Sequence, residues 1–302
     1  MTAAPNLPAT ESVDQRYRGL DTWDDATILG ALLDGQKRAL AAVEAAIPAL
    51  SKAAGLVADA LSRGGRLIYL GAGSPALISL GDALELPQTF GIPRDRIELI
   101  LAGGASITQN LAGPSEDDRD LGAREMIAAN VGPNDCVVAV SASGSTPYTV
   151  AGLVAAHERG AATVAVAGNA GAPLFSVADA EVLLDVGPEV ISGSTRMGAG
   201  TAQKAALNML STLVGVRLGH VHDNFMVNVN ADNEKLRKRS ERMVSAITGS
   251  TGDVAAAALV DSAGAVKPAI LIAAGASPDE ARRLLGQHGG VVRDALAARR
   301  KS

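Results

Sequence analysis

Small hydroxylated residues and glycines follow three apolar runs of this 302-residue chain. Residues 71–75 read GAGSP, residues 141–146 read SASGST, and residues 192–195 read SGST. Hydroxyl and free backbone N–H groups donate hydrogen bonds to oxyanions, and glycine permits a ligand to approach the backbone closely. One such loop is most often an ordinary helix cap, but three at one edge of a sheet favour a sugar-phosphate site. The candidate binding residues in these loops are Ser74, Ser141, Ser143, Ser145, Thr146, Ser192, Ser194 and Thr195.

Two carboxylates could act as a general acid and a general base. Glu85 lies near the end of the helix predicted after the first strand, and Glu116 opens the segment after the second strand. Lyases and isomerases of sugars need such carboxylates, at least one with a pKa perturbed by partial burial. Both could instead be ordinary helix residues, with Glu116 favoured by a helix dipole and Glu85 facing solvent. The residues alone leave both interpretations open.

Two cations and two histidines could complete a site. Arg196 and Lys204 follow the third hydroxylated loop, on a helix predicted over 194–217 with a Ser/Thr cap, and either could pair with a phosphate. His220 and His222 form an H-x-H pair without Cys or carboxylate partners at metal-ligand spacing, so we predict no metal site. Neither G-x-G-x-x-G nor G-x-x-x-x-G-K-[ST] is present. We therefore expect no nucleotide cofactor.

The elements that must position these residues alternate between strands and helices. Short apolar runs of buried-strand type are separated mostly by helix-length segments, which is typical of an α/β fold with a parallel sheet and helices on both faces. In such sheets ligands bind at the carboxyl ends of the strands, where the hydroxylated loops lie. The predicted strands cover residues 66–70, 97–101, 137–140, 163–167 and 182–185.

The chain divides into three parts by its sequence pattern. Residues 1–22 lack periodicity and are predicted to be an arm, whereas residues 23–240 hold a helical preface, broken at Pro48, and the sugar-phosphate-binding domain. Residues 232–242 are charged and either helical or an exposed connector. Residues 241–302 are predicted to be a small helical domain, because its apolar blocks, divided by glycines, suggest three short helices.

Composition excludes several function classes. The net charge of −5 argues against a nucleic-acid partner, because such proteins gather Lys and Arg on one face. The single cysteine, Cys136, excludes an internal disulfide. No charged-then-apolar leader opens the chain and no apolar stretch approaches about 18 residues, so we expect a cytoplasmic protein with no membrane partner.

Several motifs in order resemble the N-acetylmuramic acid 6-phosphate etherases of the sugar-isomerase (SIS) superfamily, which are related to the glucokinase regulatory protein. The small C-terminal helical region is also similar. The matching segments read GGRLIYLGAG (64–73), DALELPQTFGI (82–92), LAGG (101–104), SASGSTPYTVAGL (141–153), GPEVISGSTRMGAGTAQKAALNMLST (187–212) and NEKL (233–236).

This resemblance implies an SIS-type three-layer αβα sandwich, a homodimer with sites near the subunit interface, and no metal or organic cofactor. The implied reaction removes D-lactate from C3 of the sugar phosphate: the aldehyde form loses its C2 proton, lactate departs, and water adds to give N-acetylglucosamine 6-phosphate. The family's two acid/base glutamates align with Glu85, the acid on the leaving ether oxygen, and Glu116.

The chain departs from the family pattern at three cationic positions. The family's arginine in the first loop is absent from Gly73-Ser-Pro-Ala-Leu77, Ser145 replaces the arginine of Ser-Gly-Arg-Thr-Pro, and Gly198 replaces the lysine of Arg-Met-Lys-Ala-Gly. Either Arg196 and Lys204 compensate or the ligand differs. Three hypotheses follow: an etherase-like lyase, a sugar-phosphate sensor without turnover that regulates a partner, and a phosphosugar isomerase using His220 or His222.

Overall fold

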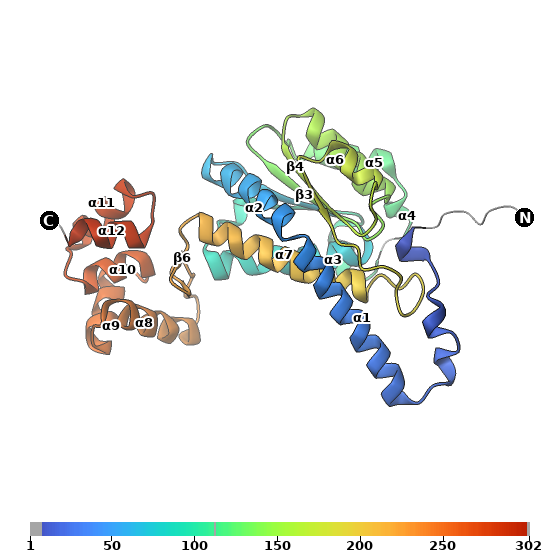
Figure 1. Cartoon of the computed structure of the whole chain (residues 1–302). Coiled ribbons are helices and arrows are strands. Elements are labelled where there is room, and N and C mark those ends of the chain that lie inside the picture. The colour runs from blue at the N-terminus through green and yellow to red at the C-terminus, as the bar shows by residue number, and fades with distance from the viewer. Residues whose placement is uncertain (1–7, 112, 301–302) are drawn as a thin grey trace, which may run out of the picture. The chain divides into compact units, whose positions relative to one another are not determined.

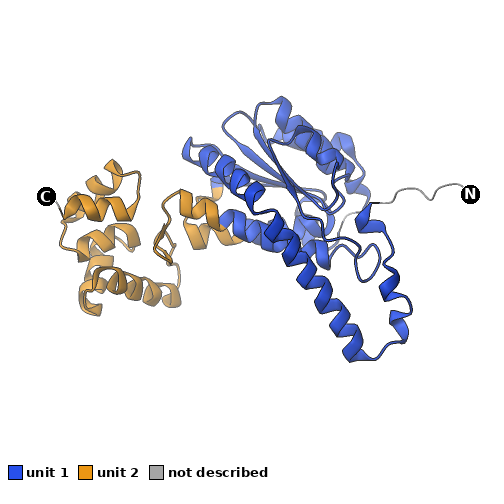
Figure 2. Ribbon diagram, in the orientation of Figure 1, with its two compact units in different colours: residues 1–83, 95–211 blue, residues 84–94, 212–302 orange. Residues whose placement is uncertain are grey.

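The fold is taken from a computed structural model that describes residues 8–111 and 113–300. The chain forms two compact units (Figure 2). The first comprises Met1–Ala83 and Asp95–Ser211, and the second comprises Leu84–Arg94 and Thr212–Ser302. Two of the unit boundaries fall within the helices α3 (Gly73–Phe90) and α7 (Gly198–Arg217), and the third, between Arg94 and Asp95, falls in a short 3₁₀ turn (Arg94–Arg96).

A five-stranded parallel sheet forms the centre of the first unit (Figure 1). The strand order is β2-β1-β3-β4-β5, and each strand lies within two residues of its predicted position, which confirms the α/β fold class. Burial on both faces explains why the sequence shows continuous apolar runs here rather than an alternating pattern. The strands are β1 (Leu67–Gly71), β2 (Ile97–Leu101), β3 (Cys136–Val140), β4 (Ala162–Ala167) and β5 (Ala180–Leu183).

Helices cover both faces of this sheet. On one face α5 (Arg119–Ala128) and α6 (Pro147–Glu158) pack against alternate strand residues, including Ile68 and Val137, in a continuous apolar core. The opposite face contacts α2 (Ile47–Ser62) and the first-unit parts of α3 and α7. These layers are the predicted three-layer sandwich (Figure 1).

A buried polar network joins β1, α3 and α7. The fully buried Tyr69 hydroxyl donates to Asp82 Oδ2 at 2.7 Å, and the other carboxylate oxygen accepts from Asn208 at 2.8 Å and Ser211 at 3.1 Å. A buried carboxylate is tolerated only when its oxygens are hydrogen-bonded. The network therefore fixes the positions of α3 and α7 on the sheet, and with them the loops from which the two helices begin.

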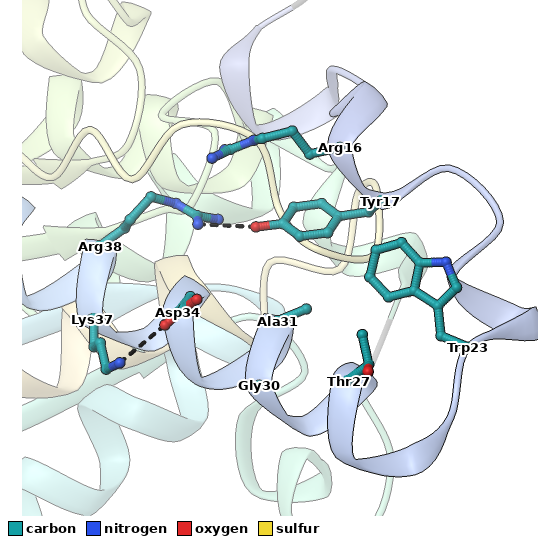
Figure 3. A pocket seen from close by; sticks show the side chains of 9 residues that line it. All are labelled: Arg16, Tyr17, Trp23, Thr27, Gly30, Ala31, Asp34, Lys37 and Arg38. Carbon is teal, nitrogen blue, oxygen red and sulfur yellow. Dashed lines mark hydrogen bonds and ion pairs between the residues drawn. The ribbon is translucent and has the colours of Figure 1, made fainter.

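The N-terminal arm consists of three short 3₁₀ turns followed by α1 (Asp25–Ala45), and the predicted break lies at Ala46, with Pro48 in the first turn of α2. Between the arm and α1 lies an open hollow of about 680 Å³ (Figure 3). Each cationic side chain that lines this hollow has a hydrogen-bond or ion-pair partner. The pairs are Arg16 with Asp14, Lys37 with Asp34, and Arg38 with the Tyr17 hydroxyl.

The second unit contains five further helices and a short hairpin, β6 (Val221–His222) with β7 (Phe225–Met226). The charged segment is helical, and the last predicted block is two helices instead of one. Gly289 and Gly290 adopt φ of +60° and +75°, which ends one helix before the next begins. The helices are α8 (Glu234–Thr248), α9 (Gly252–Asp261), α10 (Val266–Ala273), α11 (Pro278–Gln287) and α12 (Val292–Arg299).

Among the described residues no single helix is long and apolar enough to cross a membrane. Two consecutive pairs, α1 with α2 and α8 with α9, reach the required length and hydropathy only when joined across bends of 63° and 112°.

Candidate functional site

The strand order creates a topological switch point at the carboxyl edge of the sheet, the position at which open α/β sheets form a ligand crevice. β1 and β3 are neighbours, but the chain leaves β1 toward β2 and leaves β3 toward β4, in opposite directions. Ligands of open α/β sheets bind at such a switch point. Gly71 is paired in register with Val140, so the loop that begins α3 and the loop that begins α6 start side by side. Two of the three hydroxylated loops are thus brought together as predicted.

The loop between β3 and α6 is held by its own hydroxyl groups. Buried Ser141 Oγ accepts the Gly144 N–H at 3.0 Å and shares a hydrogen bond of 2.9 Å with Thr146 Oγ1. Ser145 Oγ donates to Ser143 Oγ at 2.9 Å on the more exposed part of the loop. Gly144 has φ +73°, and a Cβ there would lie 2.5 Å from Ala172 Cβ. The loop is therefore tightly packed, and only glycine fits at its centre.

The N-terminus of α6 directs its helix dipole toward the end of this loop, and its first-turn residues Tyr148 and Thr149 are fully buried. The first N–H that bonds back is that of Val150, which donates to the Thr146 carbonyl at 3.0 Å. The N–H groups of Tyr148 and Thr149 precede it, while Pro147 has none. Unpaired N–H groups and the helix dipole at such a terminus favour negative charge. This loop can hold a phosphate through its hydroxyl donors and the helix dipole.

Glu116 lies beside the loop that begins α3. It ends the short helix α4 (Gly113–Glu116), and its carboxylate lies against Gly73, where a Cβ would be 2.8 Å from Oε1. Gly73 has φ +59° and begins α3, which also carries the half-buried Ser74. Burial raises the pKa of Glu116, and the neighbouring Asp117 raises it further. A half-buried carboxylate with a raised pKa beside a ligand crevice suits proton transfer.

The third hydroxylated loop is anchored differently from the prediction. α7 begins at Gly198 rather than Ser194, because buried Glu189 accepts the N–H groups of Gly198 at 2.9 Å and Ala199 at 2.8 Å. The predicted Ser/Thr cap is therefore wrong. Ser192 Oγ instead donates to the Ser12 carbonyl at 3.4 Å.

The rest of this loop consists of turns that lead into α7. Thr195 accepts the Gly200 N–H at 2.8 Å, and Ser194 donates its N–H to Ile191 at 2.9 Å. Arg196 is exposed and Lys204 is half-buried, and neither has an ion-pair partner among the described residues. Both cations are thus available to a ligand.

The remaining sequence candidates belong to the second unit. Glu85 is an exposed residue in the last turns of α3. Burial lowers the pKa of His220 to about 4, and the charge of Lys267 contributes. Burial also lowers the pKa of His222. The described residues contain no group of three or more His, Cys, Asp or Glu side chains that could hold a metal ion.

Two residues near the crevice were missed by sequence reasoning. Thr10 of the arm is fully buried, and Asn169 donates a hydrogen bond to it and another to the Ser143 carbonyl. Asn169 lies at the carboxyl end of β4, the same edge as the hydroxylated loops, and that position was a usable signal. No comparable pattern marked Thr10.

Comparison with known proteins gives matches over most of the chain. The SIS domain matches residues 107–213. A protein of Deinococcus radiodurans named N-acetylmuramic acid 6-phosphate etherase is 44% identical over 288 residues, covering 95% of this chain and 94% of that protein. One of Mycolicibacterium smegmatis with the same name is 41% identical over 290 residues, covering 96% and 97%.

Solved structures agree on the fold. A phosphoheptose isomerase from Francisella tularensis superposes with a TM-score of 0.50 at 16% identity, covering 64% of this chain and all of that one. At this identity the similarity concerns the fold alone.

Proposed function

The chain belongs to the N-acetylmuramic acid 6-phosphate etherase family, and from that premise we propose that it cleaves the D-lactyl ether of N-acetylmuramic acid 6-phosphate. The products are N-acetylglucosamine 6-phosphate and D-lactate, so the enzyme is a carbon–oxygen lyase. The relatives carry this name at 41–44% identity over nearly their whole length. The observation that best supports the reaction is the half-buried Glu116 carboxylate, held against Gly73 at the crevice.

The phosphate is proposed to bind at the loop between β3 and α6. Ser143 and Ser145 supply hydroxyls, and the helix dipole at the N-terminus of α6 favours the negative charge. Ser141 and Thr146 hold the loop in shape through their mutual hydrogen bond. Ser74, Ser192, Ser194 and Thr195 remain predicted contacts to the rest of the substrate.

Two cations are proposed to offset the family's missing charges. Arg196 and Lys204 lack ion-pair partners among the described residues, so both can approach an anionic substrate. A charge-assisted contact contributes about 1.5–3 kcal/mol, which would recover part of the affinity lost with the arginines.

Glu116 and Glu85 are proposed as the acid/base pair. With the sugar in its open aldehyde form, Glu116 takes the C2 proton, the C3–O bond breaks, and Glu85 gives its proton to the departing lactyl oxygen. This leaves D-lactate and an unsaturated aldehyde. Water then adds its oxygen at C3 while a proton returns to C2. The raised pKa of Glu116 supports its role as the base that receives a proton. The role of Glu85 rests on its match to the family motif.

Lactate release tests the proposal. Purified protein incubated with N-acetylmuramic acid 6-phosphate should release D-lactate, and Glu85→Gln should lower kcat by about 10²-fold or more. Glu181→Gln, an exposed strand carboxylate, serves as the matched control. Binding of the sugar phosphate without lactate release would overturn the lyase proposal and favour the sensor.

A homodimer in the cytoplasm is proposed for the working enzyme. α1 carries an exposed apolar stripe, with Leu29, Leu33 and Leu40 each more than half exposed and spaced along one helix face. Such a stripe on a monomer suits a second copy of the same surface. A cytoplasmic location is proposed together with the substrate, because a sugar phosphate does not cross membranes unaided and is retained in the compartment where it forms.

A further inference from the structure

The N-terminal strap, residues 9–12, lies over two loops at the crevice. Thr10 is fully buried although it is only ten residues from the start of the chain, and its Cγ2 lies 3.4 Å from the position of a Cβ on Gly168. Ser12 accepts the Ser192 hydroxyl, and the Glu11 carboxylate lies 3.5 Å from the position of a Cβ on Gly193. The strap therefore contacts the loops after β4 and before α7.

Asn169 connects this strap to the loop proposed to bind phosphate. Its Nδ2 donates to the Ser143 carbonyl at 3.0 Å and to Thr10 Oγ1 at 3.2 Å. The Ser143 carbonyl belongs to the peptide that precedes Gly144, the residue at which the loop turns with positive φ. Fixing this carbonyl fixes the orientation of the peptide, and with it the direction of the loop's donors.

The hydrogen bonds from Asn169 to Thr10 and to Ser143 form a bridge between the strap and the loop, and this bridge has a single orientation. Only the amide nitrogen of Asn169 can donate to both partners, and its Oδ1 is buried with no partner among the described residues. Turning the amide over would leave the Ser143 carbonyl facing an oxygen. The Ser143 carbonyl, which can only accept, thus sets the orientation of the amide, and the Thr10 hydroxyl accepts the remaining N–H of the same group.

We propose that Thr10 and Asn169 are positioning residues for the sugar phosphate, acting through Ser143 without touching the ligand. This inference rests on the proposed function, because it concerns the same loop. A loop held before binding loses less conformational freedom when the ligand arrives, so the bridge strengthens substrate affinity. The chemical step at Glu116 does not depend on it. Breaking the bridge should therefore raise Kd and KM and leave kcat almost unchanged.

Four variants test the bridge. Thr10→Val keeps the shape of the side chain but removes the hydroxyl, and Asn169→Asp removes the N–H donor. Thr10→Ser keeps the hydroxyl. Thr22→Val is the matched control, because Thr22 lies in the same arm and donates only to Gly19. The measurements are Kd for N-acetylglucosamine 6-phosphate by calorimetry, kcat and KM for lactate release, and the thermal midpoint.

Thr10→Val and Asn169→Asp should raise Kd and KM by about 5- to 30-fold with kcat within about twofold of native. Thr10→Ser and Thr22→Val should stay within about twofold in every constant. An unchanged Kd in Thr10→Val and Asn169→Asp, with the thermal midpoint retained, would overturn the bridge. An equal fall of kcat and kcat/KM in these two variants would also overturn the bridge.

The same measurements separate this inference from the proposed function. Native protein that binds the sugar phosphate but releases no lactate overturns the lyase alone, and the Kd series still decides the bridge. Native protein that binds no sugar phosphate overturns both.

Discussion

The ionisation of Glu116 links proton transfer to folding. Its carboxylate is half-buried against Gly73, and burial raises its pKa above the ordinary value of 4.5. A raised pKa means that the folded state binds the proton more tightly than the unfolded state does. The carboxyl's favourable contribution is therefore complete below pH 4.5 and is lost as the pH rises through the folded pKa. Above the folded pKa the ionised group disfavours folding.

Glu116→Gln should accordingly lower activity and raise stability together. We expect kcat to fall by about 10²-fold or more, because the base is removed. The thermal midpoint should rise at pH 7, which lies above the unfolded pKa of 4.5, and the difference should vanish near pH 4. Calorimetry across this range checks the second expectation. Glu181→Gln should show neither effect, and a lower midpoint for Glu116→Gln at pH 7 would contradict the account.

Ser145 stands where the family pattern has arginine, in the loop proposed to bind phosphate. Ser145→Arg should lower Kd for N-acetylglucosamine 6-phosphate by about 10-fold or more, as expected for one charge-assisted contact. The gain should shrink in high salt, because Ser145 is exposed. Ser62→Arg adds the same charge at an exposed serine that ends α2, shortly before β1 and so at the opposite edge of the sheet. An equal gain in both variants would mean that only net charge had changed.

At the scale of elements, the five strands were predictable because burial on both faces leaves an unbroken apolar signature. The start of α7 was not predictable, because its first N–H groups donate to Glu189. This residue lies five positions before the predicted cap, Ser194, and turns separate the two. The two hydroxylated loops at the β1/β3 crevice followed from strand alternation. Contacts of the arm could not be foreseen, because Thr10 meets Asn169 across 159 residues of chain without any periodic pattern.

Lys267 gives the second unit a pH dependence of its own. Its side chain is 9% exposed, and burial lowers its pKa from 10.5 to about 8. Between pH 8 and 10.5 the unfolded chain therefore binds more protons than the folded unit, so stability rises with pH across this window. Below pH 8 the penalty of the buried ammonium is complete.

Lys267→Met should raise the thermal midpoint at pH 7 and flatten its rise between pH 8 and 10.5. The pKa of His220 should also move up from about 4, because the charge of Lys267 contributes to lowering it. Calorimetry and the ring-proton NMR shifts of His220 measure the two effects. Lys235→Met, at an exposed site on α8, is the control. A lower midpoint for Lys267→Met at pH 7 would contradict this account.

At the scale of the whole molecule, the leucine stripe of α1 bears on assembly. Leu33→Asp combined with Leu40→Asp should convert a dimer to a monomer in light scattering after gel filtration, with helicity by circular dichroism preserved, since both side chains are more than half exposed. Val260→Asp places the same charge at a 79% exposed apolar residue of α9 and should leave the mass unchanged. A dimer that persists in the double variant would exclude this surface.

The second unit is assembled from two stretches of chain, 84–94 and 212–302. Asn228 donates to the Phe90 carbonyl at 2.8 Å, and Gly215 packs on the Phe90 ring. A gene fragment that starts at Thr212 therefore encodes an incomplete unit, lacking the ring and the carbonyl against which its hairpin region closes. Because Leu84–Arg94 is made long before Thr212–Ser302, a ribosome must finish almost the whole chain before this unit can fold.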